Sequence, residues 1–300
     1  MTRTSGRRGA FHRLAARAAG LALLLAMAAL DGVGAEESRE AFQPDPGMIN
    51  ANDTAVLEPG QVEILGGHVF NHADGFFDDR SQRQPGPCLR SHSTFLQVTA
   101  GVVEDVDVTA VLGDVHGVDF GQDPDGDGNP DRLAAHGTAD AVAGVRWRFY
   151  QGGDTSAAFL AYAALPTGPS AGIDRLGLSQ EFASLTPRLV LSRNWGRLNA
   201  VADLGYSFPL GANAPGARGG LSTVLGAGYH VTDSIKPLVE VGYSNARFDG
   251  ASLSESLSLT GGVALLLSED AQAYLGLTRV LAGRNTPDLT SGTFYLLFTF

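Results

Sequence analysis

Apolar and polar residues alternate with a period of two along much of this chain. Between positions 198 and 208 the even positions are apolar or aromatic, whereas Asn199, Asp203 and Ser207 stand between them. Between 256 and 267 leucine and valine alternate in the same way with Ser256, Ser258 and Thr260. This period is typical of β-strands with one apolar face, and no segment shows a sustained helical period with caps.

Twelve segments carry the strand signal: 60–71, 93–103, 105–113, 138–150, 155–165, 183–194, 197–208, 220–231, 235–246, 255–267, 271–281 and 291–300. Their connections alternate in length. The odd-numbered ones are long, at 72–92, 114–137, 166–182, 209–219, 247–254 and 282–290, and the even-numbered ones are tight turns. Transmembrane barrels have an even strand count, short periplasmic turns and longer outer loops. Residues 60–300 are therefore predicted to form an all-β, antiparallel up-and-down transmembrane barrel of twelve strands, with both termini periplasmic.

The N-terminus has the pattern of an export signal. Five arginines precede an apolar run from Ala18 to Leu30, and Val33-Gly34-Ala35 offers small residues for cleavage. The run is too short to cross a bilayer as a helix, which takes roughly 20 residues. Residues 1–35 are therefore predicted to be a cleaved signal peptide. Residues 36–59 are polar, contain three prolines and lack periodicity, which predicts a flexible periplasmic segment.

The other end of the chain is an alternating strand that stops on phenylalanine. Phe294, Leu296, Phe298 and Phe300 share one face. This arrangement resembles the C-terminal membrane-assembly signal of bacterial outer-membrane barrels, which implies the barrel-assembly machinery as a partner and the bacterial outer membrane as the location. We expect this strand to pair with the first one and close the sheet.

Composition narrows the function classes. The formal net charge is −11, and it becomes more negative once the arginines of the signal are removed. A nucleic-acid partner is therefore not expected, because it requires a basic face. The single cysteine, Cys88, excludes an intramolecular disulfide and a cysteine metal cluster. No cofactor is expected apart from the weak calcium binding considered below. The expected partners are outer-membrane lipid, lipopolysaccharide and a small-molecule solute.

Charged residues within the strands are predicted to face the lumen. A charge facing lipid at the bilayer midplane costs about 2–4 kcal/mol for Arg or Lys, and the alternation places each of these side chains opposite an apolar face. Two interpretations stay open: the set forms a charge-filtering path for solutes, or its members pair with one another and plug a narrow barrel. The set is Glu63, Asp107, Asp140, Arg146, Arg148, Arg188, Asp203, Lys236 and Glu240.

Several short stretches resemble a known family. They are LEPGQVEI (57–64), GVVEDVDVTAVLG (101–113), ADAVAGVRWRF (139–149) and LPTG (165–168). With them, most of the mature chain resembles the outer-membrane β-barrel family labelled MetA-pathway of phenol degradation. The resemblance implies a transporter-like barrel that passes small molecules, including aromatic or apolar ones, and it implies no catalytic residues.

A loop rich in aspartate is a candidate calcium site. Asp123, Asp125, Asp127, Asn129 and Asp131 alternate, with glycine at the sixth position, as in the first half of a calcium-binding loop. The glutamate expected at position 12 is absent, because Ala134 stands there. The alternative is a solvated turn, since these residue types also favour turns.

Two other function classes compete with a channel. Ser91-His92-Ser93 invites comparison with barrel lipid-hydrolysing enzymes, and Gly168 to Gly172 fits the G-x-S-x-G pattern of hydrolases. The first lacks a companion motif and the second lacks the strand–turn–helix context, so an enzyme is not favoured. A structural or adhesive surface barrel is the third hypothesis.

Overall fold

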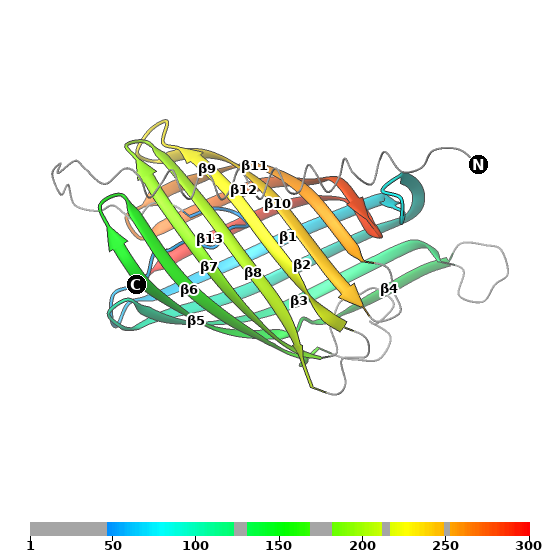
Figure 1. Ribbon diagram of the computed structural model, residues 1–300, viewed down its shortest axis with the longest axis horizontal. Coiled ribbons are helices and arrows are strands. Elements are labelled where there is room, and N and C mark those ends of the chain that lie inside the picture. The colour runs from blue at the N-terminus through cyan, green and yellow to red at the C-terminus, as the bar shows by residue number, and fades with distance from the viewer. Residues whose placement is uncertain (1–46, 123–130, 169–181, 212–216, 249–252) are drawn as a thin grey trace.

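The computed structural model describes residues 47–122, 131–168, 182–211, 217–248 and 253–300, and the strands among them form one antiparallel sheet (Figure 1). No helix among them is long and apolar enough to cross a membrane. The sheet contains thirteen strands: β1 (Val62–Phe77), β2 (Arg83–Val103), β3 (Val106–Gln122), β4 (Asp131–Thr138), β5 (Ala141–Gly152), β6 (Thr155–Leu165), β7 (Ala183–Trp195), β8 (Leu198–Leu210), β9 (Ala217–Tyr229), β10 (Ile235–Phe248), β11 (Ser254–Ser268), β12 (Ala271–Arg284) and β13 (Thr286–Thr299).

The sheet closes into a barrel of twelve strand positions. β1 pairs with both β2 and β13, and β2 pairs with β3, so the two ends of the sheet meet. β4 and β5 share one position, because β3 pairs with β5 over Val106–Val111 and with β4 from Asp114 onward. The predicted twelve-stranded barrel and the closing contact between the first and last strands are both confirmed.

The barrel has an apolar outside and a polar inside. Leu112, Trp147, Leu277 and Phe300 are among its exposed large apolar side chains, whereas Asp107, Asp203 and Glu240 are buried. The apolar wall faces lipid instead of water. Hydrocarbon offers no hydrogen-bond partners, and in the closed sheet the backbone N–H and C=O groups bond to neighbouring strands. On the terminal strand, Phe294, Phe298 and Phe300 are exposed and Leu296 is half-buried.

The strands are longer than the alternation predicted. β1 and β2 continue pairing until a turn at residues 78–82, although 72–92 was predicted to be a loop. β12 and β13 are joined by Asn285 alone, at φ 48°, instead of by the predicted loop 282–290. Beyond the membrane, strand pairing no longer requires an apolar face, so period-two hydrophobicity marks only the part of each strand that faces lipid.

Most of the described residues that precede β1 lie inside the barrel. Met48, Ile49 and Ala51 are buried in a cluster with residues of β6, β7, β10 and β12. The chain then turns at Gly60, where the backbone of Gly60 and Gln61 bonds to Gly101 of β2, and enters β1. The prediction of a flexible periplasmic segment over 36–59 is therefore corrected for the described residues 47–59. We call residues 47–58 the inner segment.

We expect Val98→Arg to reduce the free energy of unfolding by about 2–4 kcal/mol, because Val98 is exposed near the middle of the apolar wall. Urea unfolding in lipid vesicles measures this change, with Val98→Leu as the matched control. An arginine at this position that left the unfolding free energy within error would contradict the assignment of this face to lipid.

Candidate functional site

The interior of the barrel is organised by ion pairs between neighbouring strands. On β5, Arg146 donates to Asp107 of β3 from Nε at 3.0 Å and from Nη2 at 2.7 Å. On β7, Arg188 donates from Nε to Asp203 of β8 at 2.9 Å. Both aspartates are fully buried. Removing one partner of such a pair leaves an uncompensated buried charge and costs about 3–5 kcal/mol.

Glu240 holds the inner segment by its backbone. Its carboxylate, on β10, accepts the N–H groups of Ile49, Asn50 and Ala51 at 2.9–3.2 Å and the side-chain amide of Asn50 at 2.6 Å. Three consecutive backbone donors aimed at one carboxylate stabilise its charge. Glu240 is therefore the main anchor of the segment.

Two further residues of the inner segment, Asn52 and Asp53, bond to the wall. Asn52 donates its backbone N–H and side-chain amide to Asp203, at 3.0 and 2.7 Å, and accepts the hydroxyl of Tyr162 at 2.9 Å. Asp53 pairs with Arg146 at 2.5 Å. The wall's ion pairs thus extend onto the segment, so one polar network contains the barrel strands and the chain that lies between them.

Glycines of the wall make room for the apolar side chains of the segment. Ile49 packs on Gly262 of β11 and Gly276 of β12, where any side chain would overlap it. Met48 lies over Gly226 of β9, with its sulfur 3.1 Å from the place of a Cβ atom there. Glycines on β9, β11 and β12 therefore let the inner segment pack closely against this wall.

The other predicted lumen residues lie in different surroundings. Lys236 is buried, and its methylene groups pack over Gly228. Arg148 pairs with Asp105 at 2.6 Å, near the turn between β2 and β3. Glu63 lines the cavity described next. Asp140 lies where β4 and β5 separate, and its carboxylate accepts the N–H of Gly168 at 3.2 Å.

A cavity of about 720 Å³ lies beside the inner segment. Arg146 and Glu63 bring charge to it, whereas Phe95, Tyr162, Tyr274, Tyr295, Leu65 and Leu297 bring aromatic and apolar surface. The Phe95 and Tyr295 rings meet edge to face, 5.4 Å apart. Its volume is that of ordinary small-molecule sites, which combine apolar walls with a few fixed polar groups.

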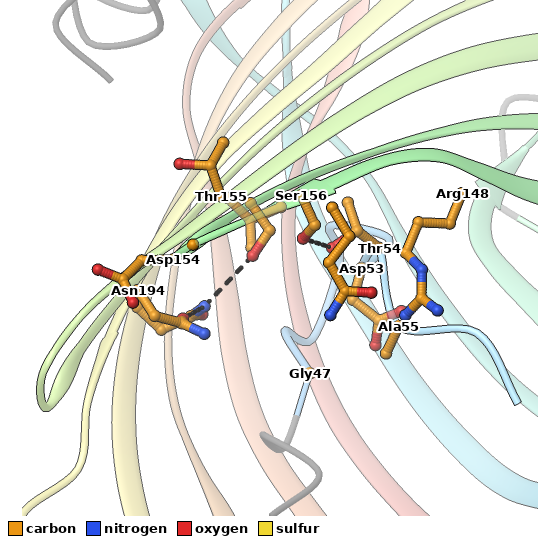
Figure 2. A pocket seen from close by; sticks show the side chains of 14 residues that line it. Gly47, Asp53, Thr54, Ala55, Arg148, Asp154, Thr155, Ser156 and Asn194 are labelled. Carbon is orange, nitrogen blue, oxygen red and sulfur yellow. Dashed lines mark hydrogen bonds between the residues drawn. The ribbon is translucent and has the colours of Figure 1, made fainter. Parts of the chain in front are cut away.

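A smaller pocket of about 160 Å³ lies near the turns β5–β6 and β7–β8 (Figure 2). Thr54 of the inner segment meets Ser156 of β6 there, with 2.5 Å between the hydroxyl oxygens. Asp53, Arg148 and Asn194 also line it. The inner segment therefore separates two spaces at the end of the barrel that carries the tight turns.

The remaining candidate sites are only partly described. Positions 123–130 of the calcium loop and Ser170 of the G-x-S-x-G match lie outside the described residues, and Asp131 begins β4. No group of three or more His, Cys, Asp or Glu side chains among the described residues is placed to hold a metal. His92 is exposed on the outer face, whereas Ser91 and Ser93 alternate with it and are half-buried. The three residues therefore form no serine–histidine pair.

Sequence reasoning missed the asparagines of the inner segment and the aromatic wall of the cavity. Asn50 and Asn52 stand in a stretch without periodicity, which by itself resembles a linker. The available signal was the set of inward glycines at 226, 262 and 276, because a wall without side chains implies that something else fills the space.

The fold matches solved structures of outer-membrane barrels. A channel from Pseudomonas putida F1 superposes with a TM-score of 0.70 at 14% identity, covering 84% of this chain and all of that one. The translocator domain of the autotransporter NalP from Neisseria meningitidis gives a TM-score of 0.47 at 13% identity, covering 81% and 90%. No protein-family model matches the chain. No curated protein matches it either. At this level of identity the likeness shows the fold alone, and the chain is an outer-membrane-type β-barrel with residues 47–58 inside.

We expect Glu240→Ala to release the inner segment, because the three backbone N–H groups lose their acceptor. Hydrogen exchange at Ile49, Asn50 and Ala51 should accelerate about tenfold or more, given the strength of hydrogen bonds to a charged group. Glu255→Ala is the matched control, since Glu255 is also buried but bonds to Tyr243 and Arg284. Unchanged protection at Ile49–Ala51 would show that the carboxylate does not anchor the segment.

Proposed function

We propose that this protein is a channel of the bacterial outer membrane that passes small molecules, and that its inner segment sets the width of the path. The observation that carries the proposal is the arrangement inside the barrel: residues 47–58 cross the lumen on Glu240, Asp203 and Arg146, and a cavity of about 720 Å³ remains beside them. The fold shared with the Pseudomonas channel supports the same class.

The cavity wall indicates the kind of solute. Phe95, Tyr162, Tyr274 and Tyr295 present ring faces and edges. Aromatic rings attract one another in offset or edge-to-face geometry, by about 0.5–1.5 kcal/mol beyond the effect of buried area. Arg146 adds a cation held by two carboxylates. We infer that small aromatic or apolar solutes pass more readily than sugars of similar size, as the resemblance to the MetA-pathway family implies. Membership in that family is part of the proposal.

The charged lumen residues were interpreted either as a charge-filtering path for solutes or as mutually paired groups that plug the barrel. In this arrangement some of them have the one role and some the other. Asp107 and Asp203 are each paired with an arginine and fully buried, so they build the wall and hold the segment. Glu63, Arg146 and Arg148 line the cavity and are available to a passing solute. The outer-membrane location and the direction of the chain, with the tight turns in the periplasm, belong to the same proposal.

We expect the mature protein in liposomes to admit small aromatic solutes faster than pentoses and amino acids, and Glu240→Ala to raise the single-channel conductance several-fold. The reason is that the released segment vacates the narrowest part of the lumen. Liposome swelling measures the first and planar bilayers the second, with Glu255→Ala as the control. Absence of permeation by every solute in both variants would overturn the channel, and equal conductance of the two would overturn the role of the segment.

A further inference from the structure

Carboxylates dominate the charged lining of the cavity beside the inner segment. Five carboxylates and two guanidiniums line it: Asp53, Glu58, Glu63, Glu269 and Asp270, with Arg146 and Arg148. Glu269 and Asp270 form the turn between β11 and β12, and Glu58 precedes β1, so the acidic groups gather at the end that carries the tight turns. The cavity therefore carries an excess of negative charge.

Both arginines of the lining are already paired with carboxylates. Arg146 contacts Asp53 at 2.5 Å and Asp107 at 2.7 Å, and Arg148 contacts Asp105 at 2.6 Å. The charged groups that lie behind the lining or deeper in the same interior do not reverse the sign. They are the carboxylates Asp105, Asp107, Asp203 and Glu240 and the cations Arg188 and Lys236. A solute in the cavity therefore meets a negative potential and no unpaired guanidinium of the lining.

Glu63 is the carboxylate that is open to a solute. It lies on the inward face of β1 and lines the cavity. Among the residues that the structure describes, its side chain forms neither an ion pair nor a hydrogen bond. Its charged neighbours are Asp53, Asp107 and Arg146, two like charges and one opposite charge. A carboxylate withdrawn from water is costly without a counter-charge, and a cationic solute would supply one.

Aromatic rings lie farther along the same face of β1. The rings of Phe95 and Tyr295 cover Gly67, where any side chain would overlap both of them. Glu63 and Gly67 are separated by four strand rises, about 13 Å, and Leu65 lies between them on the cavity wall. Tyr274 extends the aromatic surface, with its ring centre 6.5 Å from that of Tyr295. The cavity thus has a carboxylate at one end and rings at the other.

We propose that this cavity selects small organic cations, namely protonated amines that carry an aromatic group, with Glu63 receiving the ammonium group and Phe95 and Tyr295 contacting the ring. Carboxylates attract ammonium groups by charge-assisted hydrogen bonds, and aromatic faces attract them as well. The acidic lining disfavours aromatic anions. In the described part of the chain the carboxylates do not converge as metal ligands do, and an inorganic ion would leave the rings unused. The selection of transported solutes rests on the proposed channel, whereas binding in the cavity does not.

Three probes with the same ring and similar length test the charge preference: 2-phenylethylamine, 2-phenylethanol and 3-phenylpropionate, which are cationic, neutral and anionic at neutral pH. Isothermal titration of the detergent-solubilised mature protein gives their dissociation constants. We expect the amine to bind about tenfold more tightly than the alcohol, as a hydrogen bond to a charged group implies, and the anion to bind most weakly. Binding of the alcohol or the anion as tight as that of the amine would overturn the proposal.

Two variants separate the carboxylate from the rings. Glu63→Gln keeps the shape of the side chain and should weaken amine binding about tenfold, to the level of the alcohol. Phe95→Leu should weaken binding of the amine about threefold, the size of one cation–π contact. Glu104→Gln is the matched control, because Glu104 is exposed in the β2–β3 turn outside the cavity and the variant removes the same charge. An equal loss in the two glutamine variants would contradict a specific role of Glu63.

A transport measurement distinguishes failure of this inference from failure of the channel. Under a gradient of 2-phenylethylammonium chloride across a planar bilayer, the reversal potential of the parent should show that the amine crosses faster than chloride. Glu63→Gln should move this potential toward zero, and Glu104→Gln should not. Conductance without preference for the amine would keep the channel and overturn the selection. Absence of conductance together with binding that depends on Glu63 would defeat the channel and support the amine site.

Discussion

The closing ladder between β1 and β13 is the contact on which the rest of the structure depends. In hydrocarbon an open sheet edge leaves backbone groups unpaired, at a cost of several kcal/mol each. Pairing from Glu63 with Thr299 to His72 with Thr290 removes that edge. Closure also creates an interior that lipid does not reach. Charged and polar side chains can occupy that interior, provided that they find partners there.

The interior meets this condition because charged side chains of the wall form ion pairs and hydrogen bonds with the inner segment. Arg146 lies between Asp107 of the wall and Asp53 of the segment, and Asp203 lies between Arg188 and Asn52. Glu240 uses the backbone of Ile49–Ala51 as its counterpart. Each group would be costly to bury alone. Together they fix a short chain across a wide barrel, and the remaining space acquires a definite shape and an aromatic lining.

The outer wall is organised differently, because its surroundings change along the strands from hydrocarbon to a polar environment. Leu96 and Leu112 face hydrocarbon, and the same strands carry His92 and His116 farther along, where the alternation of faces continues but the residue type changes. The apolar band and the polar rim are therefore consecutive parts of single strands. The register between strands then places residues that are twenty or more positions apart in sequence side by side, such as His92, His116 and His136.

Much of the fold and part of the site could be predicted from the sequence. The period-two alternation predicted all twelve strand positions of the barrel. Because side chains alternate between the two faces of a strand, it also predicted that Arg146, Arg188, Asp203 and Glu240 face away from lipid. The alternation underestimated the length of the strands beyond the membrane, at β1–β2 and β12–β13. A strand with water on both faces needs no apolar side, so its sequence does not alternate. The alternation could not identify the role of 47–58 either, because a segment that bonds through its backbone N–H groups carries no periodic signal.

Local chemistry in the sequence therefore determined that this chain builds a barrel and which side chains avoid lipid, because the bilayer acts on each residue separately. Tertiary structure alone decided which charges meet, which glycines admit Ile49 and Met48, and where the histidines align. Those outcomes depend on register and closure, which bring together residues up to 238 positions apart, as between Val62 and Phe300.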